Sequence, residues 1–208
     1  MIMTTHIDEV MRARHSVRKY DADVRIPEAD LQHILEMAAT APSSWNLQHW
    51  RFLTIQEAAN KQRLLPIAYN QQQIVDSSAV IVILGDAEAN LVAGDVYGPA
   101  LASGYISQQV HDTLVGNIEQ AYASSSAFGR EEAIRNASLA AMQLMLAAKA
   151  KGYDTCPIGG FNREQLAEAF NIPTRYVPVM IITVGQASAP AHGTGRFPLT
   201  HSVINETF

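Results

Sequence analysis

The sequence predicts an α+β or α/β fold with few strands. The first reason is the order of the expected elements, which runs helices, strand, helix, strand, long helices, strand. The second is a pair of continuous apolar runs rich in β-branched residues, at residues 78–84 and 177–184, typical of buried strands. No internal repeat, low-complexity tract or linker divides the 208 residues, so we expect a single domain over residues 1–208.

Composition excludes several classes of protein. With 48% hydrophobic and 17% charged residues, the chain can form one sizeable core. A net charge of −5 without a basic stripe argues against a nucleic-acid partner, and no charge-free run reaches the ~20 apolar residues of a membrane helix. A single cysteine and an N-terminus without a secretory pattern suit the cytoplasm, where we expect the protein to act.

A long apolar helix followed by a Gly-Gly turn, at residues 131–161, is the stretch that we expect to organise the rest. Apolar side chains lie on all its faces, which predicts a helix that is buried all round and partly in a subunit interface. It should begin near Gly129 or Arg130 and end before Gly152, a left-handed cap. In the turn, Gly159 and Gly160 would let the backbone approach a flat or anionic ligand, although a tight connection explains the turn alone better.

The N-terminal region predicts a short helix over residues 5–14, with Thr5 and Asp8 at capping-box spacing. A basic cluster with one hydroxyl follows in this acidic protein. Guanidinium groups and a hydroxyl could hold a phosphate monoester, and a solvated basic edge is the alternative. The members of the cluster are Arg12, Arg14, His15, Ser16, Arg18 and Lys19.

A helix predicted from Pro27 to about Thr40 stops at a loop over residues 41–50. The loop combines hydroxyls and amides with two tryptophans, so it is either a binding wall or a loop anchored to the core by its indoles. It begins with Pro42, and its polar members are Ser43, Ser44, Asn46 and Gln48. Residues 52–55 then indicate a strand.

A helix over residues 57–65 should end at Pro66. Asn70 and Gln73 follow, three positions apart, and would share one face if this segment were helical. Two amides there could contact the edge of a heterocycle. A polar surface turn is the simpler explanation.

The second half of the chain offers less chemistry. Residues 90–126 predict one or two helices, interrupted near Gly98-Pro99 or Gly104. Asn162 should cap a short helix over residues 163–170. The tail from residue 187 has no packed periodicity and needs a partner surface, and Arg196 on it could be an ordinary exposed arginine.

Several mechanisms lack their motifs. Neither a P-loop nor a Rossmann glycine pattern occurs, and the seven histidines have no zinc-ligand spacing, so we expect no metal. Cys156 is expected to be buried and inert. What remains is a phosphate-type cluster, two amide-rich segments and a Gly-Gly turn, which together suit a phosphorylated flat heterocycle such as FMN.

Five segments in this order resemble the FMN-dependent nitroreductase family, and they span the chain from Arg14 to Arg196. They are RHSVRKY, PSSWNLQHW, AYNQQQI, GYDTCPIGGF and GRFPL. The resemblance implies an α+β fold in which helices wrap a small mixed sheet, in an intertwined homodimer with two FMN sites at the interface.

The resemblance also implies roles for single residues. Arg14, Ser16 and Arg196 would hold the phosphate with the backbone of His15, while Arg18, Asn70 and Gln73 would contact the pyrimidine. Pro42, Ser43, Ser44 and Asn46 would come from the other subunit. The turn Pro157, Ile158, Gly159 and Gly160 would direct a backbone N–H at flavin N5.

Three positions depart from the family pattern. Gln73 stands where many relatives have lysine, Gly159 where an acid is frequent, and Thr194 where lysine is frequent. Weaker FMN binding or a shifted reduction potential would follow.

The implied activity is ping-pong transfer of a hydride from NADH or NADPH through FMN to a nitroaromatic, a quinone or another electron-poor acceptor. We expect no catalytic side chain, because the cofactor performs the chemistry. The alternatives are other flavin chemistry on the same fold, such as reductive dehalogenation or cleavage, and a non-catalytic flavin carrier or sensor.

Overall fold

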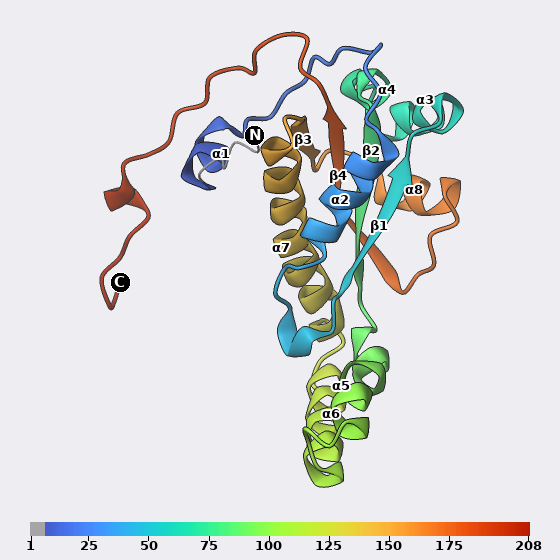
Figure 1. The fold of residues 1–208 in the computed structure, drawn as a ribbon, viewed down its shortest axis with the longest axis vertical. Helices are drawn as coiled ribbons and strands as arrows, with labels where there is room; N and C mark the ends of the chain where they lie inside the picture. The colour runs from blue at the N-terminus through green and yellow to red at the C-terminus, as the bar shows by residue number, and fades with distance from the viewer. Residues whose placement is uncertain (1–6) are drawn as a thin grey trace.

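A computed structural model describes residues 7–208, so Thr5 and the expected capping box lie outside the described residues. Its central element is α7 (Phe128–Ala150), which runs along the body of the molecule beside the sheet (Figure 1). The helix begins within two residues of the expected start. It ends before Gly152, whose φ of 89° confirms the predicted left-handed cap.

Four strands form one sheet in the order β1-β2-β4-β3. The pairs β1–β2, β2–β4 and β4–β3 are all antiparallel. A parallel bridge between Ser16 and Thr155 makes the sheet mixed at that edge alone, within residues 7–208. The strands are β1 (Trp50–Ile55), β2 (Ala79–Asp86), β3 (Asp154–Ile158) and β4 (Tyr176–Gly185).

The strand β3 differs from the sequence-based prediction, which places residues 154–160 in a turn after the long helix. Pro157 removes a backbone donor and argues against a central strand. The structure tolerates it because β3 lies at the edge of the sheet. The Gly-Gly turn therefore comes directly after a strand, and this strand separates it from the long helix.

Two apolar layers cover the sheet. Alternate residues of the fully buried β2 face opposite sides: Ile81 and Ile83 pack with α7 and α2 (Glu28–Ala38), while Val80 and Val82 pack with α3 (Ala58–Ile67) and α8 (Arg163–Ala169). Asn162 caps α8 as predicted, accepting a hydrogen bond from the Gln165 N–H. The short helices α1 (Ile7–Ala13) and α4 (Gln73–Asp76) flank this body.

The helices α5 (Ala93–Ala102) and α6 (Gln108–Ala123) project from one end of the body (Figure 1). The expected interruption lies at Gly104, which has a φ of 73°, whereas Pro99 is accommodated inside α5. A separate apolar cluster of Leu47, Ala89, Ala93 and Ile118 joins this pair to the body.

One face of α7 is open to solvent in the single chain, so its own protomer covers only part of the helix, and its burial in a subunit interface stays a prediction. Ile134, Leu139 and Met142 are 37%, 45% and 41% exposed. Small residues such as Ala137 and Ala140 face the sheet instead. An apolar face of this kind on a central helix is typical of a subunit interface.

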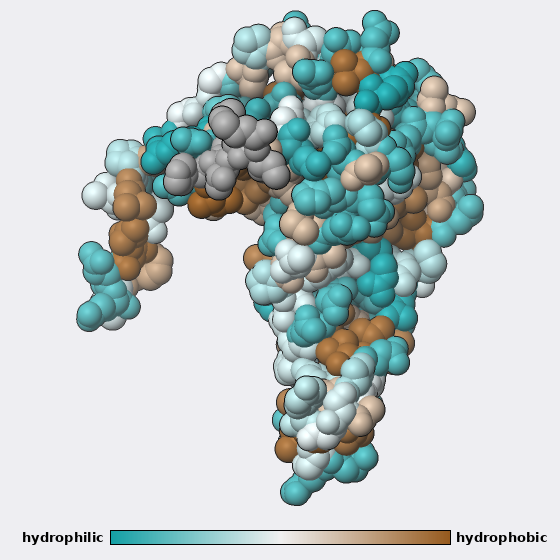
Figure 2. Space-filling view, viewed as in Figure 1, coloured by the Kyte–Doolittle hydropathy of each residue, from teal (hydrophilic) through white to brown (hydrophobic). Residues whose placement is uncertain are grey.

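The chain after β4 leaves the body as an extended arm. The arm runs beyond α1 and ends far from the sheet (Figure 1), and apolar side chains gather on its last part (Figure 2). Phe197, Leu199 and Phe208 are among its most exposed residues. Among the described residues, these apolar side chains of the arm are left open to solvent.

No helix within residues 7–208 is both long and apolar enough to cross a membrane.

The contact of α7 with β2 gives a first prediction. A Cβ on Gly85 would lie 2.6 Å from the carbonyl oxygen of Ala133, so Gly85→Ala must push α7 away from the sheet. We expect the free energy of unfolding to fall by about 1–3 kcal/mol in urea denaturation. Gly116→Ala in α6, where a Cβ meets nothing within 4 Å, is the control and should raise it by up to ~1 kcal/mol. Equal stabilities of the two variants would contradict the tight contact.

Candidate functional site

The basic segment after α1 runs beside the edge strand β3. Ser16 forms the parallel bridge with Thr155, and the Val17 N–H donates to the Thr155 carbonyl oxygen at 3.0 Å. These bonds hold the segment in an extended form along the sheet. Arg14 and Ser16 are half-buried there, while His15 and Arg18 are exposed.

The arginines and the lysine of this segment make no ion pair with a carboxylate in the described part of the chain. Within residues 7–208, no carboxylate oxygen lies within 4.0 Å of Arg12, Arg14, Arg18 or Lys19. Burial raises the pKa of the Cys156 thiol on β3, and the charges of Arg18 and Arg14 lower it in part, so both guanidinium groups act on the strand. A cluster of this kind beside a backbone edge attracts an anion such as phosphate.

The Gly-Gly turn lies directly after β3. Pro157 is half-buried and Ile158 is buried, so they fix the start of the turn, whereas Gly159 and Gly160 are exposed. A Cβ built on Gly159 would meet nothing within 4 Å. The space beside Gly159 is therefore open, as the approach of a flat ligand to the backbone requires.

A chain of amides connects this turn to the segment after α3. The Gln71 Nε2 donates to the carbonyl oxygen of Gly160 at 2.9 Å, and its Oε1 accepts from the Gln73 Nε2 at 3.2 Å. Gln73 is buried in the first turn of α4. The structure thus brings Gln73 and the Gly-Gly turn to one place.

Asn70 lies in an exposed turn ahead of α4, as the simpler of the two interpretations predicts, so it does not share a helix face with Gln73. It has a left-handed φ of 57°. Asparagine tolerates this conformation better than most residues, so the segment turns before the helix begins. The bridging residue, Gln71, was not singled out from the sequence, although it lies in the same glutamine run.

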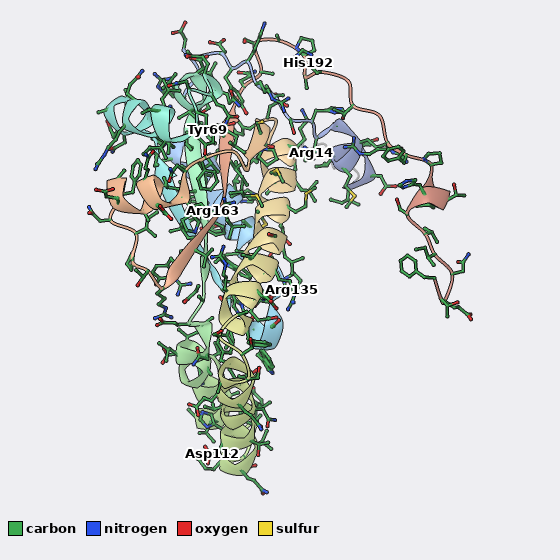
Figure 3. The ribbon with its side chains drawn as sticks, turned by 180° about the vertical axis from the view of Figure 1, so that it is seen from behind. Arg14, Tyr69, Asp112, Arg135, Arg163 and His192 are labelled. Atoms are coloured by element: carbon green, nitrogen blue, oxygen red, sulfur yellow. The ribbon has the colours of Figure 1, made fainter. Side chains whose placement is uncertain are left out.

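The second amide-rich segment lies far from the first in one protomer. The loop with Pro42, Ser43, Ser44 and Asn46 contains the 3-10 turn Ser44–Asn46 and packs beside the first half of α7. Figure 3 shows Arg14 near the C-terminal end of α7, whereas Arg135 lies much farther along α7, towards its N-terminal end. At 1.5 Å per residue, the part of α7 between this loop and β3 is roughly 20 Å long. One chain therefore does not bring the two groups together.

Arg196 lies on the extended arm, where its guanidinium donates to Thr194 Oγ1 at 3.2 Å and to the Gly195 carbonyl oxygen at 2.8 Å. Both contacts are with its immediate neighbours. The first part of the arm lies beside the basic segment, because the Ser188 N–H donates to the Lys19 carbonyl oxygen at 3.0 Å.

A buried histidine, His49, connects the end of the loop over residues 41–50 to α6. His49 is fully buried, and its Nε2 lies 2.9 Å from the hydroxyl of Tyr122 on α6. Burial lowers the pKa of His49 to about 4, although the carboxylate of Asp86 opposes the shift. Asp86 is itself held by two hydrogen bonds from Arg175, at 2.6 and 2.7 Å. Sequence reasoning assigned no role to His49, because a lone histidine carries no spacing signal.

These features define a class of protein. A cation cluster, an open glycine turn and a chain of amides meet at one sheet edge, while a second polar loop lies too far away to join them in the same chain. The arrangement suits a binding domain for a phosphorylated planar cofactor, and one chain by itself does not bring all of these groups together.

The family follows from comparison with known proteins. The chain belongs to the nitroreductase family, whose model matches residues 11–186. It is 52% identical over 198 residues to YodC of Bacillus subtilis, which its name places among NAD(P)H nitroreductases; the match covers 95% of this chain and 97% of YodC. A nitroreductase-type protein from Exiguobacterium sibiricum, solved in complex with FMN, has a TM-score of 0.89 and 39% identity, with 97% of both chains covered.

Relatives with other names also occur. The enone reductase of conjugated linoleic acid biosynthesis in Lactiplantibacillus plantarum is 34% identical over 198 residues, which are 93% of this chain and 91% of that enzyme. The relatives of this chain are therefore named after more than one kind of acceptor, nitro compounds and enones among them.

Acid should destabilise the protein through His49. The pKa of His49 in the folded protein, about 4, lies below its ordinary value of 6.5. The contribution of neutral His49 to the free energy of unfolding is therefore complete above pH 6.5 and is lost as the pH falls towards 4. The loss is about 1.4 kcal/mol per pH unit across this window. His49→Gln keeps a hydrogen-bonding group near Tyr122 and removes the titration. Urea unfolding at pH 7, 6 and 5 should show a flatter profile for the variant, and parallel profiles would contradict the assignment.

Proposed function

We propose that this protein is an FMN-dependent NAD(P)H oxidoreductase that acts as a homodimer on nitroaromatics, quinones or similar electron-poor acceptors, with one FMN-binding domain over residues 1–208. The observation that carries the proposal is the meeting of un-neutralised guanidinium groups, the open turn at Gly159 and the Gln71–Gln73 amide pair at the β3 edge. The relative solved with FMN supports the same reading.

The donor set fits each part of FMN. Arg14, Ser16 and the backbone of His15 would hold the phosphate, because guanidinium and hydroxyl donors match phosphate oxygens. Arg18, Asn70 and Gln73 would contact the pyrimidine, where amides can both donate and accept. Pro157, Ile158, Gly159 and Gly160 would present a backbone N–H to flavin N5.

A second copy would supply the rest of the site. Pro42, Ser43, Ser44 and Asn46 lie too far along α7 to reach a cofactor at β3 of their own chain, and so we assign them to the cofactor of the other protomer. Arg196 would reach a phosphate from the arm. The exposed apolar face of α7 and the apolar arm offer the surface that such a dimer would bury.

FMN supplies the redox chemistry when bound: it accepts a hydride at N5 from NADH or NADPH and passes reducing equivalents to an acceptor in a ping-pong cycle. The chain binds and orients the cofactor and positions its ring beside the Gly159 turn. We assign no side chain as a catalytic acid or base. Gln73 in place of lysine leaves Arg18 as the cation nearest the pyrimidine in this proposal, which would disfavour the anionic reduced form.

The enone reductase relative favours a second candidate within the same chemistry, namely reduction of an activated carbon–carbon double bond. Reductive dehalogenation or cleavage and a non-catalytic flavin carrier remain the contrasting outcomes. The use of NAD(P)H and the buried, reduced Cys156 suit the cytoplasm, which we propose as the location.

An absorption spectrum tests the function directly. The purified protein should show flavin bands that bleach under anaerobic addition of NADH or NADPH and return when menadione, nitrofurazone or an enone is added. The acceptor that restores the bands fastest identifies the substrate class. Bands that persist with both nucleotides would indicate a carrier, and a protein that remains colourless after added FMN would refute the cofactor.

The phosphate contacts can be tested by paired substitutions. Arg14→Ala should raise the Kd for FMN by about 10- to 100-fold, since loss of a charge-assisted contact costs roughly 1.5–3 kcal/mol. Arg12→Ala, which removes an exposed cation two residues away, is the matched control and should bind FMN as the wild type does. Flavin fluorescence titration of the apoprotein measures both. The same affinity for the two variants would argue against a specific role of Arg14.

A further inference from the structure

The loop after α2 has an unusual backbone. Trp45, Asn46 and Gln48 have left-handed φ values of 51°, 56° and 49°. Residues with a Cβ disfavour this region, and a large aromatic does so strongly. Such a conformation persists only where surrounding contacts over-determine it, and it concentrates at functional sites.

A buried asparagine on α7 holds the start of this loop. Asn136 is 2% exposed, and its Oδ1 accepts a hydrogen bond from the Ser44 N–H at 2.9 Å. Its Nδ2 donates to the backbone oxygen of Glu132 at 2.8 Å and to the Glu132 carboxylate at 3.0 Å. The side chain therefore connects the rigid central helix to the strained loop.

Glu132 fixes the orientation of that asparagine. Its carboxylate is 3% exposed and pairs with Arg135, one turn along the helix. An ionised carboxylate accepts hydrogen bonds and cannot donate them. The Asn136 amide must consequently turn its NH₂ group to Glu132 and its oxygen to Ser44, and a flipped amide would leave two donors facing each other.

Other tethers reach the loop from different elements. The Ser43 Oγ accepts from the Gln48 N–H at 3.0 Å, and the Tyr97 hydroxyl on α5 donates to the Trp45 carbonyl oxygen at 3.0 Å. Neither contact involves α7. The Glu132–Asn136 pair is thus a distinct support for the segment at Ser44.

We propose that Glu132 and Asn136 are positioning residues of the cofactor site. They act through the backbone of Ser44, which they hold so that the loop presents Ser43, Ser44 and Asn46 to the flavin of the other protomer. The inference rests on the proposed function, in which this loop contacts the cofactor. It assigns to two residues of α7, which touch no ligand themselves, control over how the flavin is bound.

The test replaces the acceptor without changing the volume of the side chain greatly. In Asn136→Leu the Ser44 N–H loses its partner, so the loop should relax. We expect the Kd for FMN to rise about tenfold and the visible circular dichroism of the bound flavin to change, because that signal depends on the asymmetric surroundings of the ring. A lower melting temperature with wild-type flavin affinity and spectrum would show a role in stability alone and overturn the proposal.

Two variants that each remove one negative charge keep the proposal testable if Asn136→Leu fails to fold. Glu132→Gln removes the charge that pairs with Arg135 and that strengthens the hydrogen bond from the Asn136 Nδ2, so it weakens the support of Asn136. Glu131→Gln makes the same charge change at the neighbouring exposed residue. Glu132→Gln should raise the Kd for FMN by about threefold and alter the flavin dichroism, and Glu131→Gln should do neither. Identical behaviour of these two variants would overturn the proposal.

The outcomes separate this inference from the proposed function. Wild-type protein that takes up no FMN refutes the function, and the positioning role with it. Wild-type protein that binds FMN, with unchanged binding in Asn136→Leu and Glu132→Gln, refutes the positioning role alone.

Discussion

The close packing of α7 against β2 is the constraint on which the rest of the structure depends. Gly85 lies against the backbone of Ala133, and the alanines of α7 that follow keep the helix close to the sheet. A helix packed this tightly on one side has few large side chains there. Leu144 and Met145 are the large α7 residues buried in the same cluster as these alanines, whereas Ile134, Leu139 and Met142 lie on the exposed face. The helix thus has the core of the protomer on one side and an apolar surface open to solvent on the other.

The position of α7 also separates the two halves of the cofactor site. Its C-terminal end leads through Gly152 into β3 and the glycine turn, while its first half supports the loop at Ser44. A straight helix holds these two regions apart at a fixed distance. In the homodimer that we propose, the cofactor would lie between two copies of the chain, and assembly and cofactor binding would then be parts of one equilibrium.

Charge is distributed in a way that fits this arrangement. Carboxylates such as Asp86 and Glu132 are buried and paired with arginines inside the protomer. The arginines at the β3 edge are instead left without carboxylate partners in the described part of the chain. An acidic protein thus keeps one local positive field for an anionic ligand, without the cost of burying an unpaired charge.

The sequence by itself determined the element types, because apolar periodicity and capping residues act locally. The buried strand β2, the cap at Asn162 and the glycine stop at Gly152 all follow from such signals, and the five motifs indicated the family through their order. The edge strand β3 escaped notice because Pro157 removes a backbone donor and only an edge position tolerates it. Tertiary structure alone decided that Gln71 meets Gly160, that Asn136 holds Ser44 and that α7 keeps one open face. These are contacts between residues distant in sequence, which depend on how the elements pack and leave no periodic trace in the chain.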